Sequence, residues 1–225
     1  MQFNIITIFP KLLDSYYQES IIGRAVRKKI IKIKYHNLRN FTNDKHHSVD
    51  DTPYGGGPGM ILKAEPIIKA LKSIKRKKNS KIIMLDPRGK IYNQKIAAKF
   101  SKLDQIIFVN GYYEGIDARV DKFIDEKISL GKFVLSNSEL ATAIVIDSTT
   151  RLLKGVLGNE ESLKTESFTE NFIEYPQYTK PEKIKFNNKT HIVPKILLSG
   201  HHAKIEEWKK KNSKKVDPAL REELD

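Results

Sequence analysis

Residues 81–111 decide the fold and read KIIMLDPRGKIYNQKIAAKFSKLDQIIFVNG. Two short apolar runs, KIIMLDP at 81–87 and QIIFVNG at 105–111, have the length of buried strands, and the first is expected to end at Pro87. The segment between them, NQKIAAKFSKL at 93–103, predicts a helix with Asn93 as its N-cap. A strand, a helix and a second strand in this order predict a parallel sheet.

The flanking segments continue the alternation. Strands are predicted from QFNIITIF at 2–9 and IKIKYHNL at 31–38, and EKISLGKFVL predicts a short extended piece at 126–135. Helices are predicted at 10–20, 64–77, 117–125 and 139–153; Pro10 is tolerated in a first turn, and Ser136-Asn137-Ser138-Glu139 has the pattern of a capping box. The prediction is an α/β domain with helices on both faces of its sheet.

The character of the chain changes after Gly158. NEESLKTESFTEN is polar and lacks periodicity, which is typical of a linker. We therefore predict a first domain at 1–158, a flexible linker at 159–172 and a small, mainly helical domain at 173–225. Cysteine is absent, which excludes disulfides, zinc–thiolate sites and a cysteine nucleophile.

The charge favours a polyanionic partner. Lys and Arg number 41 and Asp and Glu 27, a formal net charge of +14, and nucleic acid is the first such partner to consider. Lysine-rich composition also follows from AT-rich codons, so the charge supports an RNA-binding hypothesis without establishing it. No apolar run approaches the length of about 18 residues that spans a membrane, and no signal peptide is visible, so we expect a cytoplasmic protein.

Three segments at predicted strand ends are rich in glycine and turn residues: LDPRG at 85–89, NGYYEG at 110–115 and LGKFVLSNSE at 130–139. Ligands of open parallel sheets bind outside the carboxyl ends of the strands, and glycine lets the backbone approach them. Each segment alone fits an ordinary turn, but three in succession favour one composite pocket. There is no GxGxxG after the first strand and no Walker lysine motif, so a nucleoside cofactor would bind in a different mode.

The stretch DDTPYGGGPGM at 50–60 ends a polar segment, 40–59, that predicts a long loop. So many glycines and prolines exclude a helix or a central strand. A surface turn is one interpretation. A loop that lies flat against a bulky planar ligand is the one that we favour.

Together, DDTPYGGGPGM, NGYYEGID, LGKFVLSNSEL, DSTTRLLKGVLG, YPQYTKP and LLSGHHAKIEEW resemble the bacterial tRNA (guanine-N1)-methyltransferase family, in order and over nearly the whole chain. The resemblance implies a SPOUT-type fold with a trefoil knot, a homodimer, and transfer of a methyl group from S-adenosylmethionine to N1 of the guanine 3′ of the anticodon, tRNA position 37. It implies neither a DNA nor a membrane partner. Magnesium is a further expected cofactor, and its ligands cannot be assigned from the sequence.

The resemblance also implies site residues. The cofactor would be held by Leu85, Gly111, Glu114, Gly115, Leu130, Gly131, Lys132, Phe133, Val134 and Leu135. Glu166 would be the base that removes the N1 proton, and Arg151 the cation that meets negative charge on O6. The tRNA would be contacted by Tyr54, Gly55, Gly56, Gly57, Pro58, Gly59, Lys180 and His201. Without the resemblance, Glu166 reads as a solvated linker residue and Arg151 as a favourable charge at a helix C-terminus.

Four positions depart from the family's usual pattern: Glu166 replaces an aspartate, Asn137-Ser138 replaces a Gly-Gly pair, and Tyr112 replaces an arginine. Two other hypotheses therefore stay open. One is an RNA-binding relative with weakened catalysis, and the other is a SPOUT methyltransferase that acts on another RNA.

Overall fold

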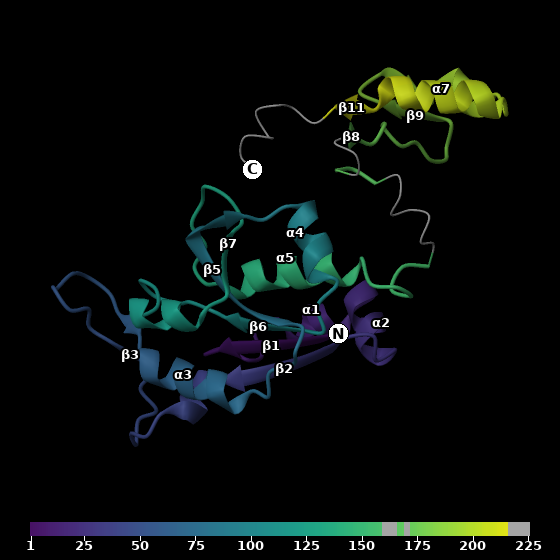
Figure 1. Ribbon diagram of the computed structural model, residues 1–225. Helices are drawn as coiled ribbons and strands as arrows, with labels where there is room; N and C mark the ends of the chain where they lie inside the picture. Colours follow the sequence, from purple (N-terminus) through teal and green to yellow (C-terminus); the bar gives the residue numbers. More distant parts are fainter. Residues whose placement is uncertain (159–165, 169–171, 216–225) are drawn as a thin grey trace. The chain divides into compact units, whose positions relative to one another are not determined.

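The computed structural model describes residues 1–158, 166–168 and 172–215, in two compact units that comprise 1–158 and 159–225 (Figure 1). The first unit is built on a parallel sheet with the strand order β2-β1-β6-β5-β7. Its strands are β1 (Gln2–Thr7), β2 (Lys32–Asn37), β5 (Ser80–Ile91), β6 (Gln105–Val109) and β7 (Glu126–Ser129). The predicted parallel sheet is confirmed.

Successive side chains along the strands point to opposite faces of the sheet and pack into two separate hydrophobic cores. On β6, Ile106 and Phe108 join one core, whereas Ile107 and Val109 join the other. The first core contains residues of α1 (Asp14–Gln18), α2 (Ser20–Arg27), α4 (Gln94–Phe100) and α5 (Glu139–Thr150). The second contains residues of α3 (Ala64–Ser73) and of the 3₁₀ helices η1 (Leu38–Phe41) and η2 (Ala118–Phe123). Helices thus cover both faces, and Figure 1 shows α5 along one face and α3 along the other.

Strand β5 is longer than predicted because Pro87 does not end it. Leu85 pairs with Ile128 of β7, residues 86–89 bulge out, and Lys90 pairs with Ile128 again. A bulge tolerates proline because its residues need not donate to the ladder. Gly89 lies so close to β7 that a Cβ atom there would stand 2.5 Å from the Ile128 nitrogen.

Other boundaries also differ from prediction. The helix predicted at 10–20 begins at Asp14, because residues 10–13 form a turn. In this turn the Leu12 N–H donates a hydrogen bond to the Phe9 carbonyl at 3.1 Å. The extended residue Glu19 separates this helix from the unpredicted helix α2, which begins at Ser20. Helix α3 stops at Ser73, and the segment 117–125 forms η2 rather than an α-helix. Asn93 caps α4 as predicted, since its side chain accepts a hydrogen bond from the Ile96 N–H at 3.0 Å.

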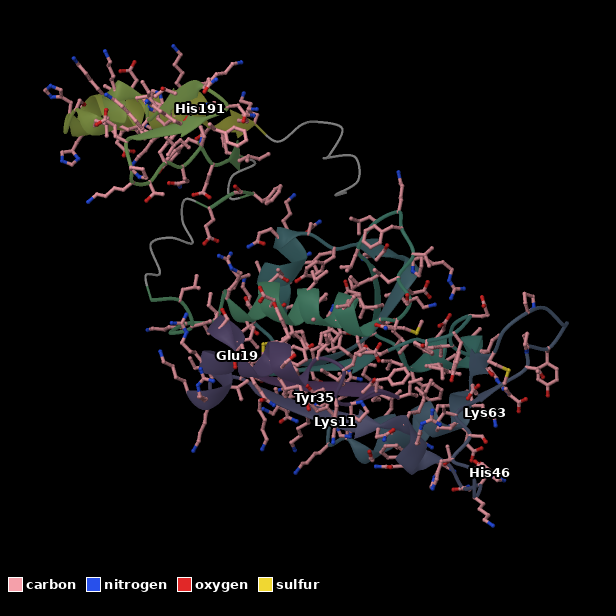
Figure 2. The ribbon with its side chains drawn as sticks, turned by 180° about the vertical axis from the view of Figure 1, so that it is seen from behind. Lys11, Glu19, Tyr35, His46, Lys63 and His191 are labelled. Carbon is pink, nitrogen blue, oxygen red and sulfur yellow. The ribbon has the colours of Figure 1, made fainter. Side chains whose placement is uncertain are left out.

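The long polar loop contains a small hairpin. Strands β3 (Asp50–Asp51) and β4 (Ile61–Leu62) pair antiparallel, so the glycine-rich residues form the tip between them. Lys63, labelled in Figure 2, lies 3.5 Å from the Asp51 carboxylate at the base of this hairpin. We call residues 52–60 the glycine tip.

The second unit mixes short strands with helix. Its described elements are β8 (Phe172–Ile173), β9 (Lys183–Phe186), β10 (Lys189–Ile192), the 3₁₀ helix η4 (Lys195–Leu198), α7 (His202–Asn212) and β11 (Lys214–Lys215). Two antiparallel strand pairs, β8–β11 and β9–β10, accompany the predicted helix. Most of the predicted linker lies outside the described residues, so the domain boundaries at 159–172 and 173–225 stay predictions. No helix in the described residues is long and apolar enough to cross a membrane.

Candidate active site

A cleft of about 650 Å³ opens beside the bulge of β5 and at the carboxyl ends of β6 and β7. Its walls are the bulge region of β5 at 84–88, the loop after β6 at 111–118, the end of β7 with the loop after it at 128–138, and Ala141 of α5. The three strand-end segments singled out in the sequence therefore converge on one site, where a ligand of a parallel sheet is expected.

The first loop is held by a buried carboxylate. Asp86 accepts hydrogen bonds from the backbone N–H of Arg88 at 2.9 Å and from the Arg88 guanidinium at 2.8 and 3.1 Å. Lys127 of β7 lies 3.3 Å from the same carboxylate. The Arg88 side chain and then its backbone N–H, with Lys127, lower the pKa of Asp86 to about 2 against the cost of burial. The bulge is thus fixed by charge as well as by the ladder.

The second loop is joined to the glycine hairpin. The Glu114 N–H donates to the Met60 carbonyl, and the Leu62 N–H donates to the Gly115 carbonyl, each at 3.0 Å. A Cβ atom on Gly59, which has a φ of +82°, would stand 2.3 Å from the Glu114 side chain, so a larger residue would force that side chain to move. Two motifs that are more than fifty residues apart in the sequence form one continuous piece beside the cleft.

The third loop is joined to the second through Ser138. Its hydroxyl accepts from the Gly111 N–H at 3.1 Å, and its own N–H donates to the Gly111 carbonyl at 3.2 Å. The predicted capping box is therefore wrong, because α5 begins at Glu139 and Ser138 makes no side-chain cap bond. Asn137 accepts from the Glu139 N–H instead, at 3.2 Å. The Asn137-Ser138 departure thus adds side-chain bonds that Gly-Gly could not make.

Most residues predicted to bind the cofactor line the cleft: Leu85, Gly111, Glu114, Gly115, Leu130, Gly131, Phe133, Val134 and Leu135. Lys132 belongs to the same run but is not among the lining residues. Asp86 and Arg88 were not predicted as individual site residues, and Ser138 was predicted only as a departure from the family's pattern. An ionisable pair next to a proline at a strand end was the signal that could have found the first two.

The other predicted residues lie elsewhere. Arg151 is the C-cap of α5, at the opposite end of that helix from the cleft. Glu166, Lys180 and His201 belong to the second unit. In the glycine tip, Tyr54 is fully exposed, and Gly55, Gly56, Gly57 and Gly59 all have positive φ angles.

A protein-bound metal site does not appear among residues 1–158, 166–168 and 172–215, where no group of three or more histidine and acidic side chains could hold an ion. Asp117, which follows Glu114 on the same turn, is engaged by the Arg119 guanidinium at 2.6 and 2.9 Å. These residues do not fit a magnesium ion held by protein side chains, and we assign no chemical step to one.

Over its whole length, the chain is similar to proteins of one family. The family model described as tRNA (Guanine-1)-methyltransferase TrmD matches residues 1–225. The tRNA (guanine-N(1)-)-methyltransferase of Clostridium novyi (strain NT) is 48% identical over 224 residues, 100% of this chain and 91% of that protein. The enzyme of the same name from Clostridium tetani (strain Massachusetts / E88) is 46% identical over 98% of this chain and 90% of its own. The crystal structure of the tRNA (m1G37) methyltransferase from Aquifex aeolicus superposes with a TM-score of 0.76 at 37% identity, covering 93% of this chain and 87% of that one.

Proposed function

We infer the function of the cleft from one premise: this chain belongs to the tRNA (guanine-1)-methyltransferase family. It is a methyltransferase that uses S-adenosylmethionine and modifies tRNA at N1 of guanine 37. Its α/β fold with a parallel sheet is of the SPOUT type, as predicted. The convergence of three strand-end loops on one cleft is the observation that carries the reading. Because the substrate is tRNA, we expect the protein to act in the cytoplasm.

The cleft suits a nucleoside donor in size and lining. Its volume falls in the range of about 300–1,000 Å³ that is usual for small-ligand sites. The exposed apolar side chains of Phe133, Val134 and Leu135 offer contacts to a flat base, and backbone groups of the glycine-rich loops can bond its edges. Glu114 contributes a carboxylate on the side that faces the glycine tip.

The chemistry needs a base and a cation. At neutral pH guanine N1 carries a proton, so a carboxylate must take that proton as N1 attacks the methyl carbon. S-adenosylmethionine, when bound, would supply the methyl group from its sulfonium, and the carbon–sulfur electron pair would stay on sulfur as a neutral thioether. Negative charge grows on O6 during the step, and a guanidinium stabilises it. We assign the base to Glu166 and the cation to Arg151.

These assignments favour a homodimer. Arg151 closes a helix of 12 residues, about 18 Å long at 1.5 Å per residue, whose other end borders the cleft. Arg151 therefore fits the cleft of a second copy better than its own. Leu140 and Ile144 of α5 and Leu12 near α1 are large apolar side chains that stay exposed in the single chain. They supply the kind of surface that such a dimer would cover.

The acceptor guanine lies in a loop of tRNA, so it can be splayed out without opening a duplex. The glycine tip, next to Glu114, is placed to receive it, and Lys180 and His201 of the second unit are exposed for contacts to the rest of the tRNA.

The activity is tested with unmodified tRNA transcripts that carry guanine or adenine at position 37. We expect N1-methylguanine only with the guanine transcript. Glu166→Ala should abolish turnover and leave the calorimetric affinity for S-adenosylmethionine unchanged, whereas Glu166→Asp should keep turnover. Normal rates for Glu166→Ala would show that the base is another group.

A mixing experiment tests the composite site. Gly111→Val should fill the cleft at a position where a Cβ atom makes ordinary contacts of 3.5 Å or more, and Arg151→Ala removes the cation. Each variant alone should be inactive. If the sites are shared across a dimer, the mixture should regain about a quarter of the activity, because half of the dimers are mixed and each of these holds one intact site of two. No recovery after subunit exchange would place Arg151 in its own chain's site.

A further inference from the structure

Arg88 is the only basic side chain among the described residues that line the cleft. The acidic side chains of this lining are Asp86 and Glu114. Lys132 belongs to the third loop but does not line the cleft. Within the described lining, an anionic group that enters the cleft therefore has one cationic neighbour, on the bulge of β5.

The guanidinium of Arg88 is held in place and is still accessible. The Asp86 carboxylate accepts from its Nε at 3.1 Å and from its Nη2 at 2.8 Å, and also from the Arg88 backbone N–H. Asp86 is buried and is itself fixed by Lys127, which in turn donates to Asp121 at 2.6 Å. The Arg88 side chain nevertheless stays 71% exposed. The cation is thus oriented by the protein but not covered by it.

One edge of this guanidinium is open to a second oxyanion. A guanidinium can bind a carboxylate with two parallel N–H groups, either through Nε and one terminal nitrogen or through both terminal nitrogens. Asp86 occupies the edge formed by Nε and Nη2. Nη1 makes no hydrogen bond with the described residues, so the edge between the two terminal nitrogens stays available. Because Arg88 is already held, a ligand at this edge restricts little additional side-chain freedom.

We propose that Arg88 binds the carboxylate of the methionine part of S-adenosylmethionine through this open edge. The inference rests on the proposed binding of that donor in the cleft. The donor carries one carboxylate together with an ammonium and a sulfonium, and the described lining offers the complementary charges, a cation at Arg88 and an anion at Glu114. A planar carboxylate also matches the shape of a guanidinium edge. Arg88 thus makes the cleft selective for donors that keep their carboxylate.

Calorimetry with two donors tests the assignment without tRNA and without methyl transfer. Decarboxylated S-adenosylmethionine lacks the carboxylate and keeps the sulfonium and the amine. The unaltered protein should bind S-adenosylmethionine about fivefold to tenfold more tightly than the decarboxylated compound, the factor expected for a partly exposed charge-assisted pair. Arg88→Met should lose this preference and bind the decarboxylated compound as the unaltered protein does. Arg88→Lys should keep part of the preference, because it retains the charge but not the two parallel N–H groups.

Arg119→Met is the matched control. Arg119 donates to Asp117, the aspartate two residues before it, from Nε at 2.9 Å and from Nη2 at 2.6 Å, as Arg88 does to Asp86. Its side chain is 73% exposed, close to the value for Arg88, but it does not line the cleft. This variant should therefore keep the full preference for the donor with a carboxylate.

Equal affinity of the unaltered protein for the two donors would overturn the proposal, and this measurement does not depend on whether Arg88→Met folds. An Arg88→Met variant that weakens both donors alike, or that keeps the preference, would overturn it too. If that variant kept its donor affinities and instead showed a higher KM for tRNA, the open edge would bind a phosphate of the tRNA. Binding of neither donor by the unaltered protein would reject the donor cleft itself, and with it this inference.

Discussion

Replacing Gly89 by alanine should damage both stability and catalysis. The new Cβ atom would stand 2.5 Å from the Ile128 nitrogen and the Lys127 carbonyl carbon, and both are backbone atoms that cannot swing away. Ordinary contact needs about 1 Å more, so β5 and β7 must separate where Lys90 pairs with Ile128. Overpacking of this kind costs about 1–3 kcal/mol, against which alanine gains about 0.4–1 kcal/mol from a less free unfolded chain.

The expected net loss in the free energy of unfolding is therefore about 1–2 kcal/mol, with methyl transfer slowed up to about 10²-fold by misplaced cleft loops. Urea unfolding followed by far-ultraviolet circular dichroism measures the loss in the free energy of unfolding. Tryptophan fluorescence does not serve here, because Trp208, the single tryptophan, lies in the second unit and Gly89 in the first. Gly158→Ala is the matched control, because a Cβ atom there meets no heavy atom within 4 Å. If Gly89→Ala were as stable and as active as Gly158→Ala, the close approach of the two strands would be refuted.

Three further predictions rest on single contacts. Gly59→Ala should weaken binding of S-adenosylmethionine more than Gly56→Ala does. Both glycines have a positive φ, but only a Cβ atom at position 59 would press on Glu114. Calorimetry of the two variants measures the difference in affinity. The pKa of Asp86 is lowered from 3.8 to about 2, so its contribution of about 2 kcal/mol should be complete above about pH 4 and vanish as the pH falls to about 2. Over this pH range, the urea concentration at the unfolding midpoint should change less in Asp86→Asn than in the unaltered protein. Asn93→Ala should lose about 1 kcal/mol with the cap of α4, measured by urea unfolding, and Asn93→Ser should recover much of it.

Short-range patterns predicted the frame of the first unit well. The strands β1, β5 and β6 were predicted from the length and composition of their apolar runs, because short continuous apolar runs are typical of strands that are buried on both faces. The Asn93 cap was predicted from one residue type beside a helical segment. The location of the cleft was predicted, because the carboxyl ends of parallel strands meet at one edge of the sheet.

Contacts between distant segments were beyond the sequence. Nothing in the order of residues shows that Gly59 packs on Glu114, or that Ser138 bonds Gly111 rather than capping its own helix. The passage of β5 beyond Pro87 depends on a bulge that Asp86 holds through charges on Arg88 and on the neighbouring strand. Such bonds form only after the sheet brings the loops together, so local propensity does not record them.

If the cleft holds the methyl donor as proposed, its composition affects how the enzyme could escape inhibition. Gly111, Gly115 and Gly131 contribute chiefly main chain to its walls, and the last two hold φ angles of +126° and +142° that other residues rarely adopt. A point mutation changes side chains, not the peptide groups that an adenosine-like inhibitor would bond. Drug resistance by simple substitution at these three positions should therefore be rare.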